Sequence, residues 1–202
     1  MNVETAIGAK GWANRNPMKA VATVSLCVIL SACASGSAKI ASRVQVTDEI
    51  SIARLFVYAN VKSRYITENV YGGLRDRLKS DFSACGVAVE MLHADPLELD
   101  MKKKIDASVA RFQADSILSI TRTGGQVLIG DGGNSGNFDF KMKINEKKTG
   151  REVWTATSDV RLLTANMFTD DRKSGERIAS GIVAKLRTDG LLKRCTNAVT
   201  FN

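Results

Sequence analysis

Residues 54–61 read Arg-Leu-Phe-Val-Tyr-Ala-Asn-Val, and they give the strongest indication of the fold. The apolar residues at alternate positions from Leu55 to Val61 fall on one side of an extended chain, whereas Phe56 and Tyr58 fall on the other. Apolar side chains on both sides are typical of a central, parallel strand that helices cover on both faces. The stretch therefore predicts an α/β fold.

A helix and a second strand are expected directly after this strand. Apolar residues recur at every fourth position from Ile66 to Phe82, which predicts an amphipathic helix over residues 64–84. Gly86 favours the end of that helix. The apolar run over residues 87–92 predicts the second strand.

A second helix is expected to begin at Asp95. Asp95 is a good N-cap, Pro96 suits the first turn, and Glu98 completes a capping box. A third strand is expected over residues 116–121. Strands that alternate with helices imply parallel pairing and right-handed crossovers. The buried side of this second helix is expected at Met101, Ile105, Val109 and Phe112.

The pattern changes after residue 137. Apolar and polar residues alternate over 138–145, which predicts a half-buried strand. A short turn leads to a second such strand over 152–162, so this pair should be antiparallel. A last helix is expected over 170–188. The whole predicts a three-layer α/β sandwich with a mixed sheet: a β-α-β-α-β core, an antiparallel strand pair and a C-terminal helix.

A glycine-rich stretch, residues 124–136, separates the two halves of this pattern. It lacks the order of a phosphate-binding loop and the ligand spacing of an EF-hand, so no metal site is predicted. Val127, Leu128 and Ile129 are apolar within it. They either extend a strand or form a partner-binding loop at the tip of a hairpin.

The amino-terminal region carries a secretion signal. An apolar run from Val21 to Leu30 follows Met18-Lys19, and it is too short to span a bilayer but fits a signal peptide. Leu30-Ser31-Ala32-Cys33 resembles the lipobox of bacterial lipoproteins. That resemblance implies a signal peptide over residues 1–32 and fatty acyl chains on Cys33. Residues 1–17 are long for the start of such a peptide, and Met-Lys before an apolar run is typical of a compact bacterial signal, so translation is expected to start at Met18.

The resemblance also implies a place in the cell. Ala34, rather than Asp, follows the acylated cysteine, which favours the outer membrane with the domain facing the periplasm. Residues 33–50 are expected to form an acylated tether. About fifteen extended residues reach roughly 50 Å, enough for the domain to stand clear of the lipid headgroups.

Cysteine usage agrees with an oxidising compartment. Cys27 leaves with the signal peptide, so Cys85 and Cys195 remain beside Cys33. Two such cysteines form one disulfide or stay as two buried thiols. A single domain over residues 51–195 is expected, followed by a tail over 196–202.

The net charge and the available side chains limit the classes of partner and reaction that this protein could have. Without residues 1–32 the chain keeps 26 basic and 20 acidic residues, a net charge of +6, which suits anionic headgroups, acidic polymers or an acidic partner. No nucleic-acid motif is present. His93, the single histidine, is expected on a surface loop, although a Cys85–His93 pair is conceivable. Lys102–Lys104 is expected to be a solvated face. No enzyme activity and no cofactor are predicted.

Two short motifs extend the resemblance beyond the lipobox. Residues 114–118, Ala-Asp-Ser-Ile-Leu, and 147–154, Lys-Lys-Thr-Gly-Arg-Glu-Val-Trp, resemble small envelope lipoproteins of Gram-negative bacteria. Their shared fold is like the amino-terminal domain of the Tol-Pal propeller protein. The curli-secretion lipoprotein and penicillin-binding-protein activator lipoprotein B have related cores.

The resemblance implies a non-enzymatic protein-binding role. We expect an adaptor or assembly factor for an envelope complex, held to the membrane by its lipid, with an unidentified protein partner. A self-associating subunit of a secretion or surface structure, and so a homo-oligomer, is the alternative. A cryptic hydrolase or ligand-binding domain is the second alternative.

Overall fold

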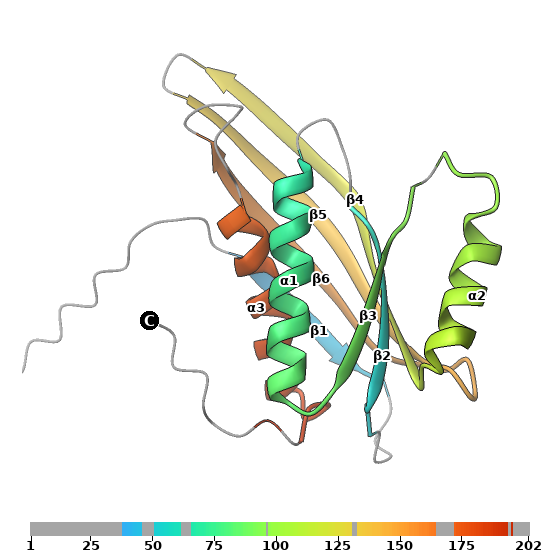
Figure 1. Ribbon diagram of the computed structural model, residues 1–202. Coiled ribbons are helices and arrows are strands. Elements are labelled where there is room, and N and C mark those ends of the chain that lie inside the picture. Colours follow the sequence, from blue (N-terminus) through green and yellow to red (C-terminus); the bar gives the residue numbers. More distant parts are fainter. Residues whose placement is uncertain are drawn as a thin grey trace, which may run out of the picture. The chain divides into compact units, whose positions relative to one another are not determined.

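The computed structural model describes residues 38–45, 51–61, 66–95, 97–130, 133–164, 172–193 and 195. The predicted signal peptide, Cys33 and the predicted tail over 196–202 lie outside these residues. Figure 1 shows the elements. In chain order they are β1 (Ala38–Val44), β2 (Arg54–Asn60), α1 (Glu68–Ala84), β3 (Ala88–His93), α2 (Met101–Phe112), β4 (Ser116–Gly130), β5 (Gly133–Glu146), β6 (Glu152–Thr164) and α3 (Arg172–Thr188).

The strands form one mixed sheet in the order β1-β6-β5-β4-β2-β3. β2 pairs in parallel with both β3 and β4, and the remaining neighbours are antiparallel. Helices α1 and α3 lie side by side on one face, and α2 packs on the other face beside β2 (Figure 1). The predicted layered α/β fold, with a mixed sheet and a C-terminal helix, is confirmed.

Strand β2 has the two buried sides that its sequence predicts. Leu55 and Val57 belong to the main core beneath α1 and α3. Phe56 belongs to a smaller core beneath α2, where Val109 is also buried. The side chains of Leu55, Phe56 and Val57 are completely buried. Because they point to both faces of the sheet, β2 lies in the middle layer.

Helices α1 and α3 approach closely because two glycines lie where they meet. A Cβ atom on Gly175 would stand 1.9 Å from the carbonyl oxygen of Val70, and one on Gly73 would stand 2.1 Å from that of Arg172. Cβ atoms do not occur at such distances, so glycine is required at both positions. Asp76 adds an ion pair between the helices, with its Oδ2 2.6 Å from Nη2 of Arg172.

Part of the predicted tether is a strand. Residues 38–44 form β1, which pairs antiparallel with β6 from Ala38 opposite Val160 to Val44 opposite Trp154. The prediction of a tether through residue 50 is therefore wrong for this segment. Only residues 34–37 separate Cys33 from β1.

Helix α2 begins later than the capping box predicts. It starts at Met101, and Asp100 occupies the N-cap. Asp95 instead accepts a hydrogen bond from the backbone N–H of Leu97 through Oδ1, at 2.9 Å. This short-range bond holds the connection in a turn, which competes with helix in this segment.

Strand β4 runs beyond the predicted residues 116–121, to Gly130. The glycines that suggest a loop make room within the sheet. Gly125 has a φ of +143°, and a Cβ atom there would stand 3.0 Å from Cδ1 of Phe138; one on Gly136 would stand 2.6 Å from Cε2 of the same ring. The Phe138 ring is buried, so it occupies the space that these glycines leave.

Candidate functional site

The strand closest to the predicted lipid site is fixed to the body of the protein. Ser42 of β1 donates a hydrogen bond from Oγ to Asp189 at 2.5 Å, and Trp154 of β6 donates one from Nε1 to the same carboxylate at 2.8 Å. Lys185 of α3 donates a third, at 2.7 Å. One carboxylate therefore ties β1, β6 and the end of α3 together.

The environment of Asp189 keeps it ionised. Burial by itself would raise the pKa of Asp189, but the hydrogen bonds from Lys185, Ser42 and Trp154 outweigh it and hold that pKa below its ordinary value. Sequence reasoning missed this residue. Its only signal was Lys185 four positions earlier on a helix.

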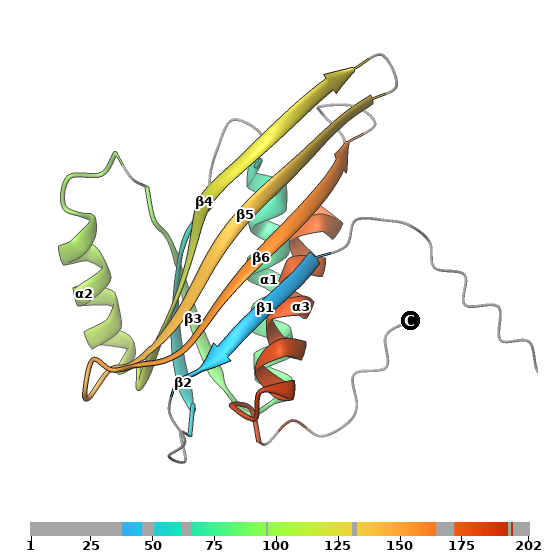
Figure 2. The same cartoon turned by 180° about the vertical axis from the view of Figure 1, so that it is seen from behind.

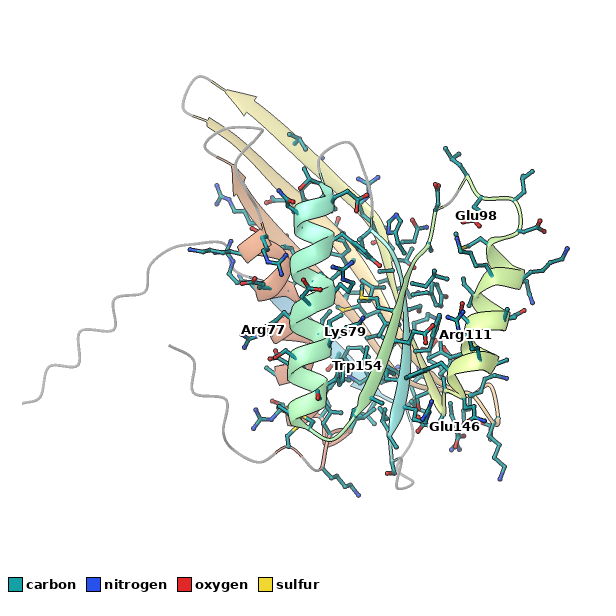
Figure 3. The ribbon with its side chains drawn as sticks, viewed as in Figure 1. Arg77, Lys79, Glu98, Arg111, Glu146 and Trp154 are labelled. Carbon is teal, nitrogen blue, oxygen red and sulfur yellow. A yellow bond between two sulfur atoms is a disulfide. The ribbon has the colours of Figure 1, made fainter. Side chains whose placement is uncertain are left out.

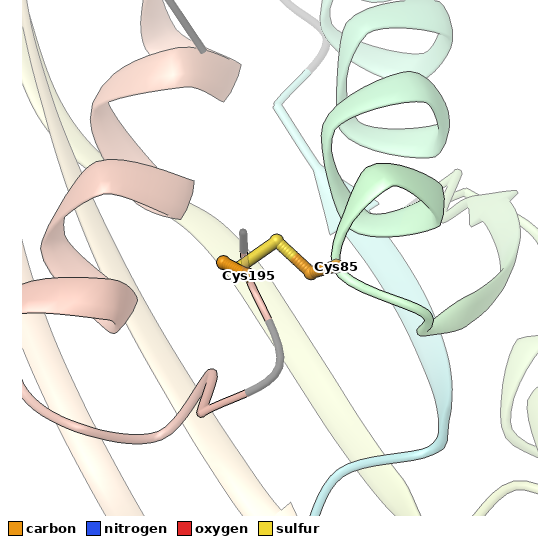
Figure 4. Close-up of a disulfide and its surroundings, with 2 residues drawn as sticks. All are labelled: Cys85 and Cys195. Atoms are coloured by element: carbon orange, nitrogen blue, oxygen red, sulfur yellow. A yellow bond between two sulfur atoms is a disulfide. The ribbon is translucent and has the colours of Figure 1, made fainter. Parts of the chain in front are cut away.

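A disulfide joins Cys85, directly after α1, to Cys195, after α3 (Figure 4). Of the two alternatives that the sequence leaves open, the structure has the bridge and not the free thiols. The two cysteines are 110 residues apart in sequence, so the bond closes most of the domain into one loop. It also rules out a Cys85–His93 catalytic pair, because Cys85 has no free thiol.

The apolar triplet of the glycine-rich stretch lies in a strand. Val127, Leu128 and Ile129 belong to β4 and pair with residues 134–136 of β5. Val127 packs against the main core. The strand alternative is therefore confirmed, and a role of these residues in partner binding stays a prediction. Asp131 and Gly132, within the glycine-rich stretch, lie outside the described residues.

The connection between β3 and α2 exposes two leucines. The exposed fraction is 87% for Leu97 and 102% for Leu99. They flank Glu98, whose side chain projects from this connection in Figure 3. Sequence reasoning placed them in the first turn of a helix and missed their exposure. Two leucines at alternate positions in a short polar segment were the available signal.

His93 is not the surface loop histidine that the sequence predicts. It ends β3, and its ring meets the Tyr71 ring edge-on with centroids 4.8 Å apart. Both ring nitrogens are buried and have no hydrogen-bond partner among the described residues. Burial raises the pKa of Tyr71 to about 12, so the phenol facing His93 stays neutral at physiological pH.

The lysine run after the exposed leucines is a solvated face, as predicted. Lys102 and Lys103 are 90% and 85% exposed, and they pair with Asp106 and Asp100. Lys104 pairs with Glu98. No group of His, Cys, Asp or Glu suited to a metal ion occurs in the described part of the chain. A shallow hollow of about 430 Å³ has Arg187 and Thr188 as its polar lining, beside Ala184, Leu192 and Cys195.

No described helix covers the sheet face opposite α1 and α3 over β5, β6 and β1 (Figure 2). Side chains there are exposed and carry both signs of charge. Side chains on neighbouring strands lie opposite one another: Lys39 of β1 is paired with Asp159 of β6, and Asp159 is paired with Asp139 of β5. We call this surface the open face; its exposed residues are Lys39, Ala41, Arg43, Asn137, Asp139, Lys141, Thr157, Asp159 and Arg161.

No protein-family profile and no curated protein matches this chain. Solved structures resemble it at low identity. A PelC dodecamer from Paraburkholderia phytofirmans is 12% identical over 74% of this chain and 94% of its own, with a TM-score of 0.45. Lipoprotein GNA1162 from Neisseria meningitidis is 17% identical over 67% and 99%, with a TM-score of 0.42.

A third solved structure belongs to a named family of unknown function. Protein XCC0632 from Xanthomonas campestris, of family DUF330, is 14% identical over 73% of this chain and 90% of its own, with a TM-score of 0.46. At these identities the similarity concerns the fold. Among the described helices, none is long and apolar enough to cross a membrane.

Proposed function

We propose that this protein is a lipoprotein of the Gram-negative outer membrane, acylated at Cys33, whose domain faces the periplasm and binds a protein of the cell envelope as an adaptor or assembly factor. One observation carries the proposal. The lipobox cysteine is followed within five residues by β1, and Asp189 holds β1 to the fold. Such a short and firmly attached connection suits a domain that a lipid anchor holds at the membrane.

The proposal gives the domain a binding role and not a catalytic one. Among the described residues, the two carboxylates whose pKa values are lowered both hold elements together. Asp189 joins β1 to α3, and Asp76, whose pKa falls to about 2 through hydrogen bonds from Arg75 and Arg172, joins α1 to α3. The open face, with its mixed charges, is the surface we assign to the envelope partner.

The anchor is tested by the intact mass of the mature protein from membrane fractions. We expect a chain that begins at Cys33 and carries fatty acyl chains, and a Cys33→Ser variant that leaves the membrane fraction. A wild-type protein that keeps residues 18–32 and a bare thiol would contradict the proposal.

The partner is tested by photocrosslinking in living cells. A photoreactive residue at Thr157, on the open face, should capture one envelope protein reproducibly. The same residue at Lys79, on the exposed outer side of α1, serves as the control and should not. No capture of any envelope protein from either position would count against the adaptor role.

Self-association is the second candidate, because β1 is an edge strand with one neighbour. An unpaired edge can pair with another chain. Light scattering of the delipidated domain tests this. A mass above that of one chain supports self-association, and a stable monomer at high concentration excludes it.

A further inference from the structure

We propose that the end of the sheet where β1 begins rests on the bilayer, and that Leu97 and Leu99 insert into the boundary between headgroups and acyl chains. This inference rests on the proposed acylation of Cys33. It adds an orientation and a second membrane contact, neither of which follows from acylation alone.

The first step is the length of the chain between anchor and fold. Residues 34–37 separate Cys33 from Ala38. A fully extended chain gains at most about 3.6 Å per residue, so the Cα atoms of Cys33 and Ala38 are at most about 18 Å apart. An acylated Cys33 lies at the bilayer surface. The domain is therefore held against that surface and does not stand about 50 Å away from it.

The second step is which end of the sheet the anchor reaches. β1 is antiparallel to β6, and two further antiparallel steps lead from β6 to β4. The amino end of β1 therefore lies at the end of the sheet where β2, β3 and β4 finish. The connection that carries Leu97 and Leu99 follows the finish of β3, so it belongs to this same end (Figure 1).

The third step is the character of the exposed side chains. The exposed large hydrophobic residues of the described chain are Val44, Leu97 and Leu99, and Val44 is only 41% exposed. The leucines are almost entirely in water, where apolar surface is unfavourable. The leucines follow β3 and the anchor precedes β1, the two outer strands of the sheet, but both lie at the same end. Two such residues at the end of the sheet that carries a lipid anchor favour insertion into a bilayer interface.

Charge does not drive this contact. The segment around the leucines contains three lysines and four carboxylates, so its net charge is −1. Each of the three lysines forms an ion pair with an acidic residue. The contact should therefore form on zwitterionic lipid and resist salt. The residues counted are Lys102, Lys103, Lys104, Asp95, Glu98, Asp100 and Asp106.

The hairpin of β4 and β5 at this end is compatible with a bilayer surface. Phe138 of β5 lies opposite Val160, and β5 begins five residues earlier, at Gly133, so the hairpin extends about 17 Å past the Ala38–Val160 pair at 3.4 Å per residue. That extension is within the reach of residues 34–37. In the sequence, residues 125–137 and 161–164 include two charged residues, Asp131 and Arg161, so few charges would enter the headgroup layer.

The test places a fluorescent bimane on a single new thiol in the full acylated protein. Leu99→Cys is labelled while Cys85 and Cys195 stay in their disulfide, and Lys148→Cys, in the turn at the opposite end of β5, is the matched control. Both proteins are reconstituted in phosphatidylethanolamine vesicles with or without brominated acyl chains. We expect a blue shift and quenching at position 99, unchanged at high salt, and neither at position 148.

The outcomes separate the two proposals. Protein that lacks acyl chains by intact mass overturns both. Protein that is acylated and bound to vesicles, but whose position 99 is quenched no more than position 148, overturns this inference and leaves the proposed function standing. A blue shift without vesicles that grows with protein concentration would assign the leucines to a second copy of the chain, and it also overturns the inference.

Discussion

Gly73 shows how one missing methyl group sets the distance between two helices. It lies inside α1 beside Gly72, and only Gly73 meets the backbone of Arg172. A Cβ atom on Gly72 would stand 3.6 Å from the nearest atom, the Nη1 of Arg172, which is an ordinary contact. Substitutions at Gly72 and Gly73 therefore report separately on helix propensity and on the close packing of α1 against α3.

Gly73→Ala should destabilise the fold and Gly72→Ala should stabilise it. Overpacking at Gly73 is expected to cost about 1–3 kcal/mol, whereas alanine at Gly72 should add about 0.5–1 kcal/mol. The measurement is the free energy of unfolding in urea for both variants. Equal stabilisation by both changes would mean that α1 and α3 do not meet at Gly73.

Asp189→Asn tests the carboxylate that holds β1. Loss of the charged acceptor for Lys185, Ser42 and Trp154 should cost about 1–3 kcal/mol at neutral pH. Because the pKa of Asp189 is lowered on folding, its stabilisation is present above about pH 3.9, the ordinary value for Asp, and disappears as the pH falls through the lower folded value.

Unfolding in urea across the acidic range measures this effect. The gap between wild type and Asp189→Asn should narrow below about pH 4. Asp106→Asn is the control, since its pair with Lys102 is exposed and is screened by solvent. A gap that stays constant at low pH would show that the charge of Asp189 is not what matters.

At the scale of elements, β1 has one bonded edge and one free edge. Gln45 donates its backbone N–H to the carbonyl of Val153 at 3.0 Å. Alternate residues of an antiparallel strand point the same way, so Arg43 also directs its N–H toward β6 and Val44 directs its own away. Both side chains are exposed, which makes the pair a clean comparison.

Arg43→Pro should therefore harm the fold more than Val44→Pro. Proline at Arg43 removes a ladder donor and leaves a carbonyl of β6 unpaired, at a cost of about 1–3 kcal/mol. Proline at Val44 occupies an edge position that sheets tolerate. Thermal unfolding of the two variants is the readout, and similar losses would contradict the assigned register.

Most of the helices and strands could be predicted from the sequence, and the strand that was missed, β1, was missed for a physical reason. β2 has apolar residues on both sides, so its pattern needs no partner to be recognised. β1 alternates too, with Ile40 partly buried between exposed Lys39 and Ala41, but its partner residue Val160 lies 122 positions from Ala38 (160 − 38). That pairing is invisible in a local window, so small polar residues suggested a tether.

The features of the candidate site also divide into those that a local sequence pattern predicts and those that depend on the whole fold. The lipobox is a local motif, and a disulfide was one of two open readings of the two cysteines left in the domain. The exposure of Leu97 and Leu99 depends on where α2 begins, and the turn at Asp95 moved that start to Met101. The role of Asp189 depends on three elements meeting: Lys185 is a local donor four residues away, but Ser42 and Trp154 come from distant parts of the chain.

At the scale of the whole molecule, the disulfide joins the segment after α1 to the segment after α3. Replacing Cys85 and Cys195 by serine should lower the free energy of unfolding by about 2–5 kcal/mol, because the chain-entropy model gives about 4.7 kcal/mol for a loop of about 100 residues. Urea unfolding with and without reductant measures the change. Reductant should weaken the wild type and leave the double variant unchanged; an effect on both would point away from this bond.

The direction of β1 also determines how the domain bears mechanical load. Seven residues of β1 pair with β6. With Cys33 acylated as proposed, a pull on the anchor along this strand would load all of its ladder bonds together, in shear, and would not unzip them one after another. Attachment through β1 would then resist mechanical unfolding better than an attachment that peels the strand from the sheet.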